Sequence, residues 1–171
     1  MCQSACYFSR PGPDVYLKST ELGCQATATQ FYDALGCTGR NRSPQLSWEN
    51  APAGTQSFAV TLYDKDAPTG SGWWHWVIFN IPAVATGLSA GAGDVHQVLA
   101  PAGSVQSLTD FGQPSYGGPC PPPGRPHQYL FIVYALKTRL ALPATALPAL
   151  VGLQLGQASL AQASLVMYGQ R

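Results

Sequence analysis

The side chains best suited to bind a ligand lie in two segments about fifty residues apart. The first segment, residues 64–76, begins with two carboxylates and ends in Trp-Trp-His-Trp. The second, residues 116–129, is rich in Gly and Pro and ends in His-Gln-Tyr. Each runs from turn-forming residues into an apolar, β-prone stretch. Polar side chains held at the end of a sheet by stiff loops suit a small-ligand pocket.

Asp64 and Asp66 follow an apolar stretch and precede Ala67-Pro68. One interpretation is a turn in which the Asp side chains accept hydrogen bonds from backbone N–H groups, because Asp-x-Asp near Pro is common in turns. The other is a carboxylate that lines a pocket. The residues alone leave both open.

His75 shares a strand face with Trp73 and Val77 if side chains alternate regularly. It is either a core histidine satisfied by one hydrogen bond, or a ring that a nearby Asp orients while its other nitrogen stays free. His127 and Tyr129 are two residues apart, so they project from one face of the same strand.

Gly117, Gly118 and Gly124 allow close approach of the backbone, and consecutive N–H groups in such turns can form an anion-binding concavity. With two imidazoles and a phenol nearby, a small oxyanion is the expected guest. We expect His75 and His127 to donate to it from cationic or N–H-bearing rings, so that affinity weakens as pH rises.

Catalytic motifs are scarce. The chain lacks a Gly-x-Ser-x-Gly elbow, a phosphate-binding loop, a dinucleotide fingerprint and a His-Glu-x-x-His helix. A divalent-metal site built from Asp and His, with Ser71 or Cys120 as nucleophile, is the remaining enzymatic alternative. The simpler interpretation is a loop hydroxyl for Ser71, and a bridged or buried sulfur for Cys120.

Length and composition predict one soluble domain. The chain has 171 residues, of which 10% are charged, with 18 Gly, 15 Pro and a net charge of +1. Few charges and many turn formers disfavour long surface helices. No basic stripe could follow a nucleic-acid backbone or an anionic membrane, so neither partner is expected.

The five cysteines follow no zinc spacing, and composition does not fix their redox state. Residues 1–13 are expected to form a loose arm before a single domain, 14–171. Helical periodicity is confined to Leu147, Leu150, Val151 and Leu155. Residues 83–114 are expected to be mostly loop. The expected strands are 15–19, 28–32, 46–48, 57–63, 74–81, 128–136 and 163–168, with a weaker candidate at 95–99. Several strands are apolar on both faces, and the pattern predicts a mainly β fold, a β-sandwich with a peripheral helix.

Five motifs resemble the phosphatidylethanolamine-binding protein family, in particular its bacterial, Raf kinase inhibitor-like branch. They are Ser-Pro-Gln-Leu-Ser-Trp at 43–48, Pro-Ala-Gly-Thr at 52–55, Asp-x-Asp-Ala-Pro-Thr-Gly-Ser-Gly-Trp-Trp-His-Trp at 64–76, Gly-Gly-Pro-Cys-Pro-Pro at 117–122 and His-x-Tyr at 127–129. They occur in the family's order, and the resemblance covers residues 15–168.

The resemblance implies an antiparallel β-sandwich with one or two short peripheral helices. It also implies a cis bond between Ala67 and Pro68, and a pocket for phosphate, phosphoryl-ethanolamine or similar small anions. Lys65 departs from the family, which often has proline there. The implied ligand residues are Asp64, Asp66, His75, His127 and Tyr129, with Pro68, Gly118 and Pro122 shaping the rim.

From the residues and the resemblance together we expect a non-enzymatic module that binds small phosphorylated or acidic ligands and needs no cofactor. The alternative is an inhibitor or scaffold that docks a kinase or peptidase through the pocket rim. An exposed apolar patch near Trp73 would favour docking. The family's eukaryotic C-terminal helix has no counterpart after Tyr168, which argues against kinase control. A homodimer is left open.

The resemblance further implies that Cys37 and Cys120 lie close together and can form a disulfide, because the family places both loops around the same pocket. Such a bridge would brace the site. It would also favour a periplasmic or otherwise extracytoplasmic location narrowly over the cytoplasm.

Overall fold

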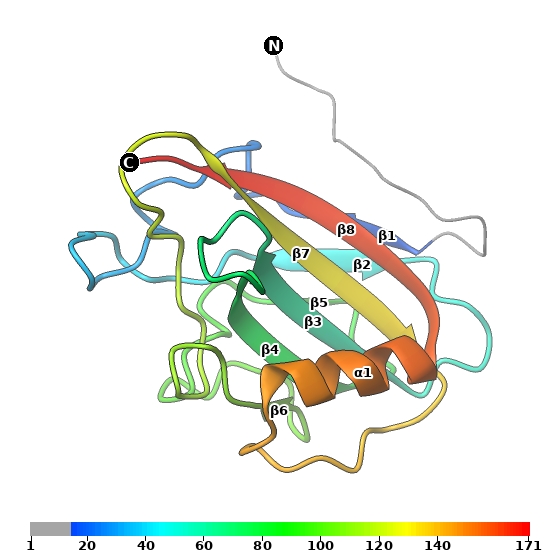
Figure 1. Ribbon diagram of the computed structural model, residues 1–171. Coiled ribbons are helices and arrows are strands. Elements are labelled where there is room, and N and C mark those ends of the chain that lie inside the picture. The colour runs from blue at the N-terminus through cyan, green and yellow to red at the C-terminus, as the bar shows by residue number, and fades with distance from the viewer. Residues whose placement is uncertain (1–14) are drawn as a thin grey trace.

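The protein is described from a computed structural model that covers residues 15–171. The expected arm, residues 1–13, lies outside the described residues. The elements in chain order are β1 (Tyr16–Lys18), β2 (Leu46–Glu49), β3 (Ser57–Asp64), β4 (Trp73–Pro82), β5 (Gly87–Leu88), β6 (Val105–Gln106), β7 (His127–Leu136), α1 (Pro148–Ala158) and β8 (Ser159–Gly169), as Figure 1 shows.

Two antiparallel sheets form the fold. The larger has the order β6-β4-β3-β7-β8, and the smaller has the order β1-β2-β5. Leu17 and Trp48 of the smaller sheet share one buried core with Val60 and Phe131 of the larger. Because side chains alternate along a strand, one face of β3 and β7 fills the space between the sheets. The predicted antiparallel β-sandwich is confirmed.

The other face of the larger sheet is covered by α1, which crosses it in Figure 1. Val151 and Leu155 of the helix pack with Ala59, Val77 and Phe79 of the sheet in a second core. This second layer explains why the central strands are apolar on both faces. The predicted single helix is confirmed.

Two leucines of the predicted helical stripe do not pack against the sheet. Leu147 precedes the helix as its N-cap and is 64% exposed, and Leu150 is 44% exposed. The buried stripe instead consists of Pro148, Val151, Leu155 and Ala158.

Two predicted strands are turns. In residues 28–32, the backbone N–H groups of Gln30 and Phe31 both donate to the carbonyl of Thr27, and the Gln30 side chain accepts from the Thr27 N–H. In residues 95–99, the Asp94 carboxylate accepts the N–H of His96. Local side-chain to backbone bonding overrides strand propensity at both places. Residues 83–114 are mostly irregular, as expected, apart from β5 and β6.

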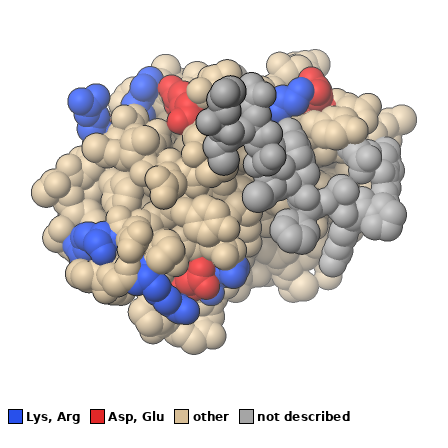
Figure 2. Space-filling view, turned by 90° about the horizontal axis from the view of Figure 1, so that it is seen from above, with Lys and Arg blue, Asp and Glu red and all other residues tan. Residues whose placement is uncertain are grey.

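No helix within residues 15–171 combines the length and apolarity needed to cross a bilayer. The face seen in Figure 2 is largely uncharged, and its few Lys, Arg, Asp and Glu side chains are scattered without a basic stripe.

Candidate functional site

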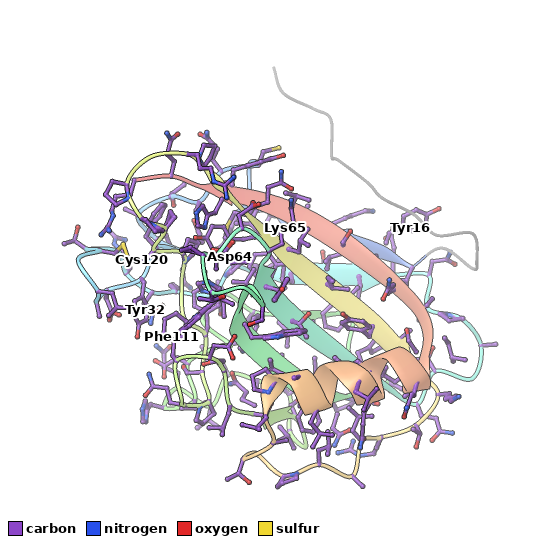
Figure 3. All side chains as sticks on the ribbon, viewed as in Figure 1. Tyr16, Tyr32, Asp64, Lys65, Phe111 and Cys120 are labelled. Atoms are coloured by element: carbon purple, nitrogen blue, oxygen red, sulfur yellow. A yellow bond between two sulfur atoms is a disulfide. The ribbon has the colours of Figure 1, made fainter. Side chains whose placement is uncertain are left out.

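The two segments singled out by sequence meet at one end of the larger sheet. Asp64 is the last residue of β3, where it pairs with Tyr129 on β7 and with Trp73 on β4. Figure 3 shows Asp64 and Lys65 at this end, with the Cys120 loop nearby. Because paired residues in a sheet share a face, Asp64 and Tyr129 lie side by side at the end of the sandwich interior.

Asp64 and His127 form a buried pair. Oδ2 of Asp64 accepts a hydrogen bond from Nδ1 of His127 at 2.8 Å, and Oδ1 accepts the backbone N–H of Asp66 at 2.9 Å. Asp64 is 3% exposed and His127 is 4% exposed. The carboxylate therefore fixes the proton of His127 on Nδ1 and leaves Nε2 as the ring atom available to a ligand. Both interpretations of Asp64 apply, because the same carboxylate closes a turn and orients an imidazole.

Asp66 fits the turn interpretation. Its Oδ2 accepts the backbone N–H of Gln128 at 2.8 Å, and the Lys65 ammonium lies 3.6 Å from its Oδ1. Burial works against the charged form, but the Gln128 bond and the charges of Lys65 and Arg125 outweigh it and lower the pKa of Asp66. Asp66 thus ties the turn after β3 to the start of β7, and Lys65 pairs with it at the surface.

His75 occupies a β-bulge. Leu62 pairs with Trp76 and Tyr63 pairs with Trp74, so His75 is the extra residue on β4. A bulge breaks the alternation of side chains. The expectation that His75 shares a face with Val77 is therefore wrong: His75 packs on Tyr129, whereas Val77 belongs to the core beneath α1.

Gly117 bonds to His75 twice, once at the ring and once at the backbone. Nδ1 of His75 donates to the Gly117 carbonyl at 2.7 Å, and the Gly117 N–H donates to the His75 carbonyl at 2.8 Å. A carbonyl only accepts, so Nδ1 carries the proton. Burial lowers the pKa of His75 to about 4, although the Gly117 carbonyl and Asp64 oppose that shift. The expectation that His75 donates to a bound anion at neutral pH does not fit these surroundings, because its N–H is used by Gly117 and burial disfavours a second proton.

Tyr129 lies between the two imidazoles. Its ring meets the His75 ring edge-on at 5.1 Å and stacks on the His127 ring at 6.4 Å between centroids. The hydroxyl is buried and makes no hydrogen bond of good geometry within residues 15–171, although Asp64 and the Cys120 backbone lie close to it. Burial, and then the nearby Asp64 charge, raise the pKa of Tyr129. The phenol therefore stays protonated and has a hydrogen bond to give.

Neither Gly117 nor Gly118 offers a free N–H group, contrary to the expected concavity, whereas the Cys120 backbone of the same loop lies close to the Tyr129 hydroxyl. The Gly117 N–H donates to His75, and the Gly118 N–H donates to Oδ1 of Asn41 at 2.7 Å. Gly118 is required for another reason: a Cβ there would lie 1.9 Å from the Gln30 carbonyl oxygen. The loop therefore packs against the chain near Gln30 and positions His75, instead of cradling an anion itself.

The predicted rim prolines, Pro68 and Pro122, are both exposed, and neither makes a hydrogen bond or ring contact with the cluster. No peptide bond in the described residues is cis, so the implied cis bond between Ala67 and Pro68 is wrong. A trans chain closes this turn, in which the Thr69 N–H donates to the Ala67 carbonyl at 2.8 Å.

Sequence reasoning missed the aromatic cover of the site. The Phe111 ring meets the His75 ring edge-on at 5.3 Å and also contacts Trp73 and Tyr32. Figure 3 shows Tyr32 and Phe111 side by side next to the Cys120 loop. The signal available was the length of the connection 83–114, since long loops in compact domains are often functional.

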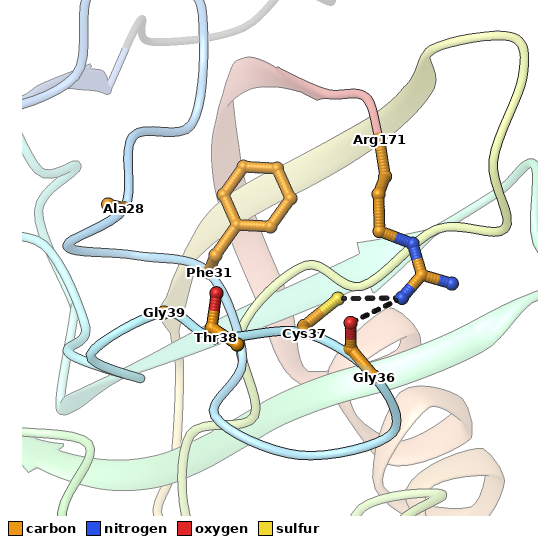
Figure 4. A pocket seen from close by; sticks show the side chains of 7 residues that line it. All are labelled: Ala28, Phe31, Gly36, Cys37, Thr38, Gly39 and Arg171. Carbon is orange, nitrogen blue, oxygen red and sulfur yellow. Dashed lines mark hydrogen bonds between the residues drawn. The ribbon is translucent and has the colours of Figure 1, made fainter.

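The implied disulfide is present: Cys37 and Cys120 are bonded, with Cα atoms 5.9 Å apart. An extracytoplasmic location accords with the bridge and stays a prediction. Beside it lies an open hollow of about 290 Å³, where Nη1 of Arg171 donates to the Gly36 carbonyl at 2.8 Å, as Figure 4 shows. None of the predicted ligand residues lines this hollow.

Within residues 15–171, no cluster of three or more His, Cys, Asp and Glu side chains is arranged to hold a metal ion. The polar groups that the structure brings together are the Asp64–His127 pair, the His75 imidazole and the Tyr129 hydroxyl. This set can exchange hydrogen bonds with a small polar group.

The chain is similar in sequence and structure to proteins of Escherichia coli. Escherichia coli K12 YbcL is 45% identical over 162 residues, which cover 92% of this chain and 88% of YbcL. E. coli YbhB is 47% identical over 135 residues, which cover 78% of this chain and 85% of YbhB. A crystal structure of E. coli YbcL, titled a new member of the mammalian PEBP family, superposes with a TM-score of 0.89 at 44% identity, covering 92% of this chain and 98% of that one.

The resemblance that the motifs indicated is thereby confirmed along most of the sequence. The family model described as phosphatidylethanolamine-binding protein matches residues 21–170. This range includes every predicted ligand residue and both bridged cysteines. The chain belongs to the phosphatidylethanolamine-binding protein family.

Proposed function

We propose that this protein is a non-enzymatic module that binds small phosphorylated or other anionic ligands at the cluster of Asp64, His75, His127 and Tyr129. The observation that carries the proposal is the Tyr129 hydroxyl, which is buried beside two imidazoles and makes no hydrogen bond of good geometry within the described residues. A buried polar group without a partner is costly, and a ligand that accepts from it removes that cost.

The buried Asp64–His127 pair supports the same proposal. The site offers two acceptors, Nε2 of His75 and of His127, and one donor, the Tyr129 hydroxyl. Because these groups are already fixed at the end of a rigid sheet, ligand binding costs little further ordering of side chains. The Phe111 ring, itself packed against Trp73, lies on the His75 ring and limits access of water there, which strengthens polar contacts of that imidazole.

Docking of a kinase or peptidase through the rim gains no specific support. Trp73 is only half-buried, but its ring is covered on one side by Phe111, and it does not belong to the large exposed apolar side chains of the described residues. We therefore retain ligand binding as the proposed function.

Replacing Tyr129 by Phe should weaken binding of inorganic phosphate or phosphorylethanolamine by about tenfold, because one hydrogen bond to a charged ligand is lost. The free energy of unfolding should stay unchanged or rise slightly, since the variant removes a buried hydroxyl that makes no hydrogen bond of good geometry. Calorimetric titration and urea unfolding measure the two effects. Tyr16→Phe is the matched control, because Tyr16 lies on β1, away from the site in Figure 3. Equal affinity of the Tyr129 variant and the wild type would place the ligand elsewhere.

The non-enzymatic part of the proposal has its own test. Purified protein should show no esterase, phosphatase or peptidase turnover with or without added divalent metal ions. Turnover that disappears in both His75→Ala and His127→Ala would make the cluster an active site and overturn this part of the proposal.

A further inference from the structure

We propose that the site selects anions that carry their own O–H group, such as hydrogen phosphate and singly protonated phosphomonoesters, over anions without one, such as sulfate. The residue that makes the selection is His75, which acts as a hydrogen-bond acceptor through Nε2. This inference rests on the proposed function, because it concerns the ligand of the same cluster.

The first step is the fixed tautomer of His75. Its Nδ1 donates to the Gly117 carbonyl at 2.7 Å, so the ring cannot turn without breaking this bond, and the backbone bond from the Gly117 N–H to the His75 carbonyl keeps the two residues in register. Neutral imidazole carries one N–H, and that N–H is already in use. The hydrogen bond that fixes the ring is made by Nδ1, so Nε2 presents a lone pair, with the Gly118 backbone also close to the ring. Burial, which lowers the pKa of His75 to about 4, keeps the ring in this form near neutral pH.

The second step is the charge around the ring. The titratable groups near His75 are Asp64 at the end of β3 and His127 and Tyr129 on β7. Both oxygens of Asp64 already accept hydrogen bonds, and His127 gives its Nδ1 proton to Asp64. Tyr129 supplies a donor. The loop N–H groups of Gly117 and Gly118, which could have held a bare anion, are used within the protein, and the Cys120 N–H lies at the Tyr129 hydroxyl and not at His75.

The third step is the match to a ligand. An anion with no proton would place an oxygen lone pair against the lone pair of Nε2, unless His75 first takes up a proton against its burial. Hydrogen phosphate accepts from Tyr129 and donates its own O–H to Nε2. A site with a buried acceptor rejects a ligand that cannot donate to it, because the acceptor is left without a partner.

Calorimetric titrations with inorganic phosphate and with sulfate at matched ionic strength test the proposal. Near pH 7 phosphate should bind about tenfold to hundredfold more tightly than sulfate. The ratio should shrink towards pH 5, because sulfate binding takes up a proton at His75 and so strengthens as pH falls, whereas phosphate brings its own. Titration in two buffers of different ionisation enthalpy measures that proton uptake.

His75→Asn is the diagnostic variant. An Asn side chain can still donate to the Gly117 carbonyl but has no group at the position of Nε2, so the phosphate-to-sulfate ratio should fall by about tenfold, to the part that Nε2 of His127 contributes. His96→Asn, a change at an exposed loop histidine, should keep the wild-type ratio. Nitrogen-correlated NMR of the imidazoles reads the tautomer directly, and should show His75 protonated on Nδ1 alone near neutral pH.

The outcomes separate this inference from the proposed function. If both anions bind equally and His75→Asn leaves the ratio unchanged, the selection by His75 is wrong while the binding function stands. The same conclusion follows if NMR shows His75 as an imidazolium, or protonated on Nε2. If neither phosphate nor sulfate binds, nor phosphorylethanolamine, the proposed function itself is overturned.

Discussion

Replacing Asp64 by Ala is expected to lower the free energy of unfolding by about 3–5 kcal/mol and to abolish binding of phosphate. The carboxylate is 3% exposed and accepts two hydrogen bonds, from Nδ1 of His127 and from the N–H of Asp66. Its removal leaves the buried Nδ1–H of His127 and the partly buried N–H of Asp66 without an acceptor, and also a cavity at the end of β3. Typical domains have about 5–15 kcal/mol of stability, so the variant should remain folded. Urea unfolding near pH 7 measures the loss.

Asp110→Ala is the matched control for this prediction. Asp110 also accepts one backbone N–H, that of Trp74, but it is exposed, so water can replace the lost partner and the loss should be much smaller. His127→Gln and the Asp64→Ala/His127→Gln double variant complete a cycle. If Asp64 acts through His127, the two losses should be less than additive. A loss of under about 1 kcal/mol in Asp64→Ala would show that the pair is not a structural element.

The central strands were predictable from the sequence because their residues are apolar on both faces, which indicates that the sheet is covered on both sides. Residues 57–63, 74–81 and 128–136 are apolar on both faces, and the structure places one sheet face against β1 and β2 and the other against α1. Apolar segments of this length that are bounded by turn residues and rich in β-branched and aromatic residues favour a buried strand over a helix or a loop. Residues 28–32 were wrongly predicted as a strand. The side chains of Thr27 and Gln30 form hydrogen bonds that close a turn, and strand propensity does not take such bonds into account.

The candidate site was predictable as a set of residues and not as a set of hydrogen bonds. His127 and Tyr129 share a face because β7 alternates regularly, and the Asp64 position at the end of β3 brings it to them. His75 was misplaced relative to Val77 because a bulge has no mark in the sequence. The roles of Gly117 and Gly118 were also missed, since they depend on His75 and Asn41, residues 42 and 77 positions away.

Replacing both Cys37 and Cys120 by Ser is expected to lower the free energy of unfolding by about 2–5 kcal/mol, because the bridge closes a loop that is long in sequence. The two cysteines are 83 residues apart, for which chain entropy alone gives about 4.5 kcal/mol. Phosphate affinity should change far less than stability. The loop is held independently where Gly118 donates to Asn41 and where Tyr32 donates to the Pro119 carbonyl at 3.0 Å.

The control for the disulfide prediction is urea unfolding of the wild type and the double variant with and without a thiol reductant. A thiol reductant should move the urea midpoint of the wild type to that of the double variant and leave the double variant where it is. Cys24→Ser should behave as the wild type under both conditions, since Cys24 is a free thiol in the described residues. A wild type that does not respond to complete reduction, confirmed by thiol titration, would mean that the packing of the two loops, and not the bridge, stabilises this end of the sandwich.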